Sequence, residues 1–210
     1  MDDGGVGGNA LVSDKRIYVE GGGGRLLDAQ CREGFRKLLE NSGFKGRVPR
    51  IVACGKRNDA YDNFKNVQEG SPTDYIALIV DSEDPVADTD APWAHLATRD
   101  GWERPKGAND DQVFLMTTCM ETWIITDRAS LSQYYGTKFR ESALPALNNI
   151  EGRDRHAEIQ DKLATATKGC TNAFEKGKRS FEVLAALNPS ILRDRLSAFA
   201  RMIAILEEKL

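Results

Sequence analysis

The sequence predicts an α/β fold, in which a mostly parallel sheet of about four strands is flanked by helices and followed by a C-terminal helical extension. Two observations lead to this prediction. Short β-branched and aromatic runs alternate with amphipathic segments in the first half of the chain, and one run, residues 75–81 (YIALIVD), is almost entirely apolar. Such a run is typical of a parallel strand that is covered on both faces.

The elements before this run alternate between strand and helix. Residues 16–20 (RIYVE) have the composition of a buried strand. Residues 47–55 (RVPRIVACG) predict a second strand, in which Pro49 marks the start or a sheet edge, and residues 60–69 predict a weaker helix. The helix between the two strands ends at Gly43 and has one apolar face, which consists of Leu27, Cys31, Phe35 and Leu38.

The second half is predicted with less regularity. Residues 85–107 are interpreted as a long ordered loop, and residues 123–127 (WIITD) as a fourth strand. The remainder is mostly helical, and Asn188 with Pro189 marks the start of a final helix. The buried stripe of that helix is predicted to be Leu192, Leu196, Phe199, Ile203 and Leu206.

Length and composition favour one globular domain with an appendage. The chain has 210 residues, of which 40% are hydrophobic and 29% are charged. We expect a disordered Gly-rich N-terminus (1–15), an α/β domain (16–130) and a helical extension packed on it (131–210). The sequence has no apolar run of about 20 residues and no signal-peptide pattern, so we expect a soluble, cytoplasmic protein. The four scattered cysteines are interpreted as reduced, buried thiols.

Carboxylates gather where strands are predicted to end. Glu20 closes the first strand before four glycines, and Asp81 and Glu83 close the apolar strand. Because the carboxyl ends of parallel strands lie at one edge of a sheet, we expect these side chains to lie close together. Like charges at this spacing repel each other, and a hard divalent cation such as Mg²⁺ relieves the repulsion. The alternative is a solvent-facing acidic turn. The glycines would allow a ligand to approach the carboxylates closely.

Several motifs together resemble a known family. The segments IYVEGGG, CGKRNDAYDNF, LIVDSEDP, CMETWIITD and EKGKRSFEVL occur in the order typical of the TOPRIM-related proteins grouped as domain of unknown function 4276. This resemblance spans most of residues 16–210. It implies a TOPRIM-like domain related to the OLD-type nucleases, dependent on Mg²⁺ or Mn²⁺, and often encoded beside an AAA/ABC-type ATPase in bacterial anti-phage defence loci.

The resemblance also implies roles for individual acids. Glu20 resembles the general acid/base glutamate of TOPRIM enzymes, and Asp81 and Glu83 resemble their metal-binding pair, although many TOPRIM proteins have Asp at the second position. Glu121 occupies the place of a later acidic residue in OLD-type relatives, and Asp127 is a further candidate. We therefore expect Glu20, Asp81, Glu83 and Glu121 to form the metal site.

Two basic clusters are candidates for contacts with phosphates. Lys56 and Arg57 follow the second strand, and Lys178 and Arg179 lie in a late basic segment that we expect to face the acids. For each cation, ordinary surface charge is the alternative. Trp93 and Trp102 are candidates for base stacking, but core packing or anchoring of the loop is favoured.

These observations favour a metal-dependent nuclease that cuts DNA or RNA. The net charge of −3 argues against tight autonomous binding to nucleic acid, so we expect a partner, an ATPase, to deliver the substrate, and an oligomer is compatible with this assembly. One alternative is a non-catalytic TOPRIM-like subunit that regulates such a partner. Another is a nucleotide-binding protein that uses the Gly-rich turn, although this turn lacks the spacing of the known phosphate-binding motifs.

Overall fold

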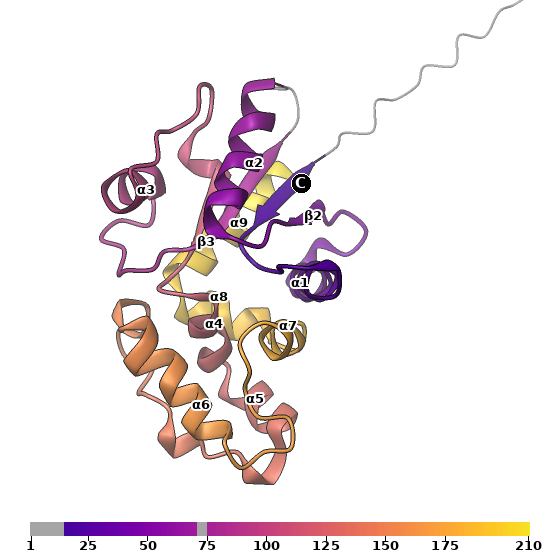
Figure 1. Ribbon diagram of the computed structural model, residues 1–210, viewed down its shortest axis with the longest axis vertical. Helices are drawn as coiled ribbons and strands as arrows, with labels where there is room; N and C mark the ends of the chain where they lie inside the picture. The colour runs from indigo at the N-terminus through magenta and orange to yellow at the C-terminus, as the bar shows by residue number, and fades with distance from the viewer. Residues whose placement is uncertain (1–14, 71–74) are drawn as a thin grey trace, which may run out of the picture.

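The computed structural model describes residues 15–70 and 75–210, except for the side chain of Lys178 (Figure 1). All but the last residue of the segment predicted to be disordered, 1–15, lies outside the described residues. No helix in the described part of the chain is long and apolar enough to cross a membrane.

A four-stranded, all-parallel sheet forms the centre of the fold, which confirms the predicted α/β class. Its spatial order is β2 (Arg50–Ala53), β1 (Arg16–Val19), β3 (Ile76–Asp81) and β4 (Val113–Met116). Strand β2 lies at an edge of the sheet, as Pro49 indicates. Strand β3 is central and buried along its whole length, which explains its continuous apolar run.

Helices cover both faces of the sheet and extend beyond it (Figure 1). They are α1 (Arg25–Leu39), α2 (Arg57–Gly70), α3 (Pro92–Asp100), α4 (Met120–Thr126), α5 (Arg128–Tyr135), α6 (Asp161–Thr167), α7 (Lys178–Leu184), α8 (Pro189–Arg195) and α9 (Ser197–Lys209). Two short π-helices (Glu40–Phe44, Arg155–Gln160) and four 3₁₀ turns (Asp110–Gln112, Gly136–Lys138, Glu141–Ala143, Ile150–Gly152) connect some of them.

Alternating residues of the strands face two separate cores. In β3, Ala77 and Ile79 face the core that contains α1 and α4, whereas Leu78 and Val80 face the core that contains α2 and α3. This alternation follows from the two-residue period of a strand. It places α1 and α2 on opposite faces of the sheet.

The C-terminal helices pack onto the α1 side of the sheet. Helix α7 lies against α1, and α9 lies against β4, so residues from both halves of the chain share one hydrophobic cluster. The α1–α7 contact requires Gly34, because a Cβ there would lie 2.8 Å from the carbonyl oxygen of Phe181. This close packing brings residues 176–181 to the carboxyl edge of the sheet.

Three predicted elements differ from the structure. Residues 123–127 are not a strand: the fourth strand is β4, and WIIT belongs to helix α4. A short apolar run fits a buried helix as well as a strand, and all seven residues of α4 are buried. The loop over 85–107 contains helix α3, which has Pro92 in its first turn. The predicted final helix is divided at Leu196 into α8 and α9, although the predicted apolar stripe is buried.

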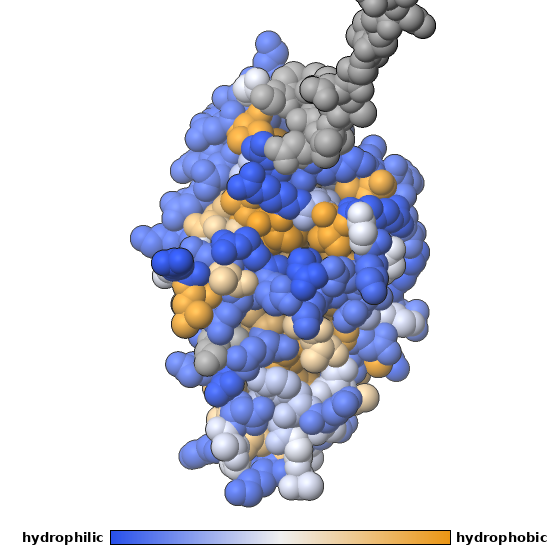
Figure 2. Space-filling view, turned by 90° about the vertical axis from the view of Figure 1, so that its right-hand side faces the viewer, coloured by the Kyte–Doolittle hydropathy of each residue, from blue (hydrophilic) through white to orange (hydrophobic). Residues whose placement is uncertain are grey.

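The tryptophans of the predicted loop pack into the core, which confirms the interpretation favoured from the sequence. Trp93 and Trp102 are 5% and 8% exposed, and the ring of Trp102 stacks on Tyr61 with 4.4 Å between centroids. They are therefore not available for stacking on bases. The side of the molecule that carries α1 and β2 is mainly hydrophilic, with a few hydrophobic patches among charged residues (Figure 2).

Candidate acidic metal centre

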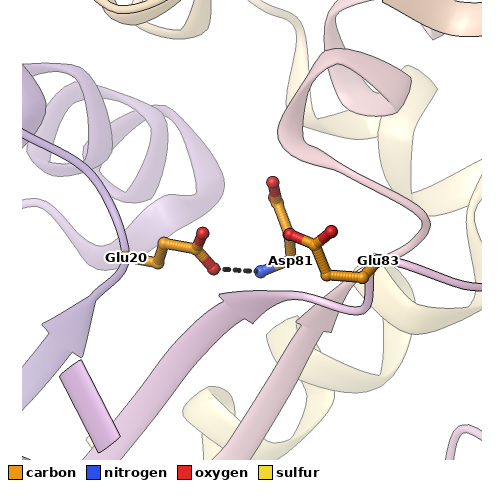
Figure 3. A group of neighbouring side chains, drawn as sticks. All are labelled: Glu20, Asp81 and Glu83. Atoms are coloured by element: carbon orange, nitrogen blue, oxygen red, sulfur yellow. Dashed lines mark hydrogen bonds between the residues drawn. The ribbon is translucent and has the colours of Figure 1, made fainter. Parts of the chain in front are cut away.

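Three carboxylates meet at the carboxyl edge of the sheet (Figure 3). Glu20 follows β1, Asp81 is the last residue of β3, and Glu83 lies in the turn after it, with a positive φ of 69°. One carboxylate oxygen from each residue lies within 4.8 Å of the others. The predicted convergence is confirmed, and this acidic trio has the oxygen-rich chemistry that a hard divalent cation prefers. The chemical roles of the three residues stay a prediction.

Backbone hydrogen bonds fix Glu20 beside Asp81. The amide of Glu20 donates to the carbonyl of Ile79 (2.9 Å), and the carboxylate Oε2 of Glu20 accepts from the amide of Asp81 at 3.1 Å (Figure 3). Gly21 exchanges two backbone hydrogen bonds with Gly55, at 3.0 and 2.7 Å. Gly21 has a φ of 140°, and a Cβ there would lie 3.0 Å from the ring of Phe181. A glycine is therefore required directly after Glu20.

Asp81 is held in a buried position. It is 6% exposed, and its Oδ1 accepts a hydrogen bond of 2.8 Å from the amide of Met120, the first residue of α4. Burial raises the pKa of Asp81 well above its usual range, and the charges of Glu20 and Glu121 raise it further, while Arg155 acts in the opposite direction. The charged form of Asp81 thus benefits from any nearby cation.

Two arginines that the sequence analysis did not select contact the acidic trio. Arg155 donates from Nη1 to Glu83, and its Nη2 lies 3.8 Å from Asp81 Oδ2. Arg99 lies 3.4 Å from Glu83 and 3.1 Å from Asp84. No local pattern pointed to Arg155, because it lies far from the acids in the sequence and outside the quoted motifs.

Arg57, predicted to contact phosphates, forms its hydrogen bonds and ion pairs with groups of the protein itself. Its side chain is 12% exposed and donates to the carbonyl oxygen of Asp81, while Nη1 lies 3.4 Å from Glu20 and Nη2 lies 2.7 Å from Asp100. The guanidinium also lies over the ring of Trp102, 4.8 Å from its centroid. In this structure Arg57 positions and neutralises Glu20, and it does not form part of the open surface.

Glu121 lines a cavity next to the acidic trio. It is 1% exposed and accepts hydrogen bonds from Gln160 Nε2 (3.1 Å) and Ser180 Oγ (3.2 Å). Together with Glu20 and Asp81 it lines a cavity of about 350 Å³. Glu121 does not belong to the group of carboxylates within 4.8 Å of one another, so its predicted part in the metal site stays a prediction.

The sequence of this chain matches one protein family. The model of a family described as "Domain of unknown function (DUF4276)" matches residues 19–207. The chain belongs to the DUF4276 family. This confirms the family suggested by the sequence motifs, whereas a relation to the TOPRIM and OLD proteins is not part of this finding. No curated protein and no solved structure matches the chain.

Asp127 has a structural role in this DUF4276 chain. It is fully buried, its Oδ1 accepts from the amide of Ser130 at the start of α5, and its Oδ2 accepts from the amide of Asn188 at 2.8 Å. These contacts join α5 to the start of α8. Asp127 is not among the residues that line the cavity or form the acidic trio.

The predicted basic residues are distributed differently around the cavity. Lys56 is exposed next to Gly55, which lines the cavity, and Lys178 begins α7 but its side chain lies outside the described part of the structure. Arg179 forms an ion pair of 2.8 Å with Glu182 and is not a lining residue. The lining cation from this segment is Lys176.

The backbone amides of the Gly-rich turn in the DUF4276 chain are hydrogen-bonded to a side chain of the following helix, α1. The amides of Gly23 and Gly24 donate to Asp28 Oδ1 at 2.9 and 3.3 Å. A phosphate bound by a nucleotide-binding loop would need such amides. This contact therefore weighs against nucleotide binding by the turn.

Proposed function

We propose that this protein is a metal-dependent phosphodiesterase, a TOPRIM-like nuclease that hydrolyses DNA or RNA. The observation that carries the proposal is the convergence of Glu20, Asp81 and Glu83 within 4.8 Å at the carboxyl edge of a parallel sheet. The order of acids, a glutamate after β1 and an Asp-x-Glu pair after β3, supports the finer likeness to TOPRIM enzymes. The pKa of Asp81 is raised by burial and by neighbouring negative charges, and such a raised pKa is typical of a functional site.

The carboxylates fit a hard divalent ion, Mg²⁺ or Mn²⁺, with Asp81 and Glu83 as the residues that would hold it and Glu20 as the base beside it. Such an ion would neutralise the negative charge that develops on the oxygens bound to phosphorus and would activate a water. Glu20 uses Oε2 for its contacts with Arg57 and the amide of Asp81, which leaves Oε1 to accept the proton of the attacking water. The water oxygen bonds to phosphorus as the ester P–O bond breaks, and the leaving oxygen takes a proton from solvent.

We also propose that this protein acts as the effector subunit of an ATPase-associated bacterial anti-phage defence system. The resemblance of its motifs to TOPRIM-related proteins encoded beside AAA/ABC-type ATPases supports this assignment. The net charge of −3 supports it as well, because a protein with a net negative charge gains no overall electrostatic attraction to phosphates. A partner that delivers the nucleic acid removes this disadvantage.

A direct test measures cleavage of labelled DNA and RNA by the full chain, alone and with its partner ATPase, in Mg²⁺, Mn²⁺ or EDTA. We expect cleavage only with a divalent ion, and we expect Asp81→Asn and Glu20→Gln to abolish it. Asp84→Asn is the matched control, because Asp84 lies in the same acidic turn but is 67% exposed and outside the trio. Cleavage that persists in Asp81→Asn or in EDTA would overturn the proposal.

One observation favours a second candidate, a non-catalytic interaction subunit. Arg57, Arg99 and Arg155 already contact the carboxylates, as in a structural network of ion pairs. In that case millimolar Mg²⁺ has no site to bind. A metal titration followed by thermal unfolding separates the candidates, because a ligand that binds only the folded state raises the unfolding temperature. An unchanged unfolding temperature favours the interaction subunit.

A further inference from the structure

The cavity beside the acidic trio has a volume of about 350 Å³. Its acidic side consists of Glu20, Asp81 and Glu121, of which the last two are nearly inaccessible to solvent, with 6% and 1% of their surface exposed. The volume is near the lower end of the range for pockets that hold small organic ligands, about 300–1,000 Å³. A group that reaches the carboxylates must therefore enter the cavity, and only a small group fits.

The rest of the lining is bare backbone and apolar side chain. Gly21, Gly22, Gly55 and Gly177 contribute backbone, while the apolar side chains are Leu27, Met116, Met120 and Phe181. The ring of Phe181 is packed against Gly21, so closely that a Cβ on that glycine would lie 3.0 Å away. Phe181 is 5% exposed, so its ring is packed in the core and is not open for stacking, whereas Leu27 is partly exposed at the cavity. The apolar surface of Leu27 suits a nucleobase, which has an apolar face whatever its sequence identity.

Few cations of the described residues are open to a phosphate here. Arg57, Arg99 and Arg155 are bound to carboxylates of the protein itself. Lys176 lines the cavity and is exposed, and Lys56 is exposed next to Gly55. Proteins that bind duplex DNA neutralise many phosphates along the backbone, with a lysine or arginine for each. The charges described at this cavity suit one or two phosphates.

From these three observations we propose that the cavity takes one unpaired nucleotide, with its phosphate between the acidic trio and Lys176 and its base against Leu27. The proposal rests on the nuclease function and names its substrate class, single-stranded nucleic acid. A base in a duplex would have to leave its stack to enter the cavity, which costs free energy, whereas an unpaired base enters without that cost.

The test measures binding of the full chain to labelled, phosphorothioate-linked strands, which resist hydrolysis, in the presence of Mg²⁺. The strands compared are single-stranded DNA, single-stranded RNA and the matching duplexes. Comparison of the two single strands shows whether the site prefers deoxyribose or ribose. Leu27→Trp fills the cavity from its lining. Leu26→Trp is the matched control, because Leu26 is the neighbouring residue, is 69% exposed and is not a lining residue.

We expect single strands to bind more tightly than duplexes, and we expect Leu27→Trp, which fills the space for the base, to weaken single-strand binding about tenfold, the order of one lost contact to a base. Leu26→Trp should bind as the wild type does, and Mg²⁺ should raise the unfolding temperature of all three proteins equally. Equal or tighter binding of duplexes, unchanged binding by Leu27→Trp, or no binding of either form would overturn the inference.

The two proposals fail in different ways. If the complex cuts duplexes and single strands equally and loses both activities in Asp81→Asn, the inference is wrong while the nuclease function stands. If single strands bind as expected but are never cut with any divalent ion, the binding site stands and the nuclease function is wrong.

Discussion

Arg155 donates a hydrogen bond to Glu83 and lies 3.8 Å from the carboxylate of Asp81, with 10% of its side chain exposed. It begins a π-helix, Arg155–Gln160, that packs beside α4. A counter-charge for two strand-end acids thus comes from a segment outside the sheet. A metal ion that binds Asp81 and Glu83 must compete with this guanidinium, so metal binding is linked to the position of Arg155.

The first prediction is that Arg155→Ala strengthens metal binding while weakening the metal-free protein. Removing Arg155 leaves Asp81 without the guanidinium that offsets its charge and leaves Glu83 with Arg99 alone, at a cost of about 3 kcal/mol in the free energy of unfolding, the low end for a buried pair. Mg²⁺ then binds without competition and restores part of this loss. Thermal unfolding with and without Mg²⁺ measures both effects, and we expect a larger Mg²⁺-dependent rise in unfolding temperature than in the wild type.

Arg153→Ala is the matched control for this experiment. Arg153 lies two residues away and pairs with Glu158 at 2.8 Å, and it makes no ion pair with the acidic trio. Its Mg²⁺-dependent rise should equal that of the wild type. If Arg155→Ala responds to Mg²⁺ no more than Arg153→Ala does, Arg155 does not compete with a metal.

The second prediction is that Asp81→Asn leaves the metal-free protein as stable as the wild type or slightly more stable. Burial and the charges of Glu20 and Glu121 raise the pKa of Asp81, so the charged carboxylate is unfavourable there. An asparagine removes the charge and keeps an acceptor for the amide of Met120. Urea unfolding in EDTA measures the stability of both proteins without metal. Mg²⁺ should then stabilise the wild type but not Asp81→Asn. A large loss of stability in EDTA would identify Asp81 as a structural residue.

Much of the fold could be predicted from the sequence, because its strongest patterns are local. The apolar run of β3 and the regularly spaced apolar residues of α1 predict which residues are buried. The parallel arrangement of the strands then places Glu20 and Asp81 at one edge of the sheet. The helix α4 was mistaken for a strand because its residues are buried on every side, so no period was visible.

The arginines around the acids could not be predicted in the same way. Arg57 looked like an open cation, and only the fold shows that Asp100 and Trp102 hold it. Arg155 reaches Asp81 through the packing of the C-terminal helices, a contact between distant parts of the chain for which no local sequence rule exists. The same packing makes Lys176 a lining residue. Arg179 instead pairs with Glu182 three residues further along α7, which is a local contact within one helix.

The third prediction is that Asp127→Ala destabilises the fold without changing the response to metal. The amides of Ser130 and Asn188 lose their acceptor in a buried site, at a cost of about 2–4 kcal/mol in the free energy of unfolding. Urea unfolding measures this cost, with the exposed Ser132→Ala as a control in the same helix. A change in the Mg²⁺-dependent stabilisation would show that Asp127 acts in the metal site after all.

The fourth prediction concerns the pH dependence of Asp100→Asn. Burial raises the pKa of Asp100, but the hydrogen bonds and charges of Arg57 and Arg99 outweigh burial, and the net pKa lies below its usual range. A lowered pKa means that the folded state favours the charged form. The stabilisation by Asp100 is therefore fully present above the pKa of an unfolded aspartate, about 4, and is lost as the pH falls through the lowered pKa.

We therefore expect Asp100→Asn to lower the free energy of unfolding at neutral pH and to have a progressively smaller effect as the solution is acidified below about pH 4. Urea unfolding of the wild type and the variant over this range gives the difference directly. Glu208→Gln, at an exposed position of α9, controls for the general effect of removing one negative charge. A cost that stays constant down to the acid end of the range would show that Asp100 acts through its shape and hydrogen-bond geometry and that its charge is not what holds Arg57 beside Glu20.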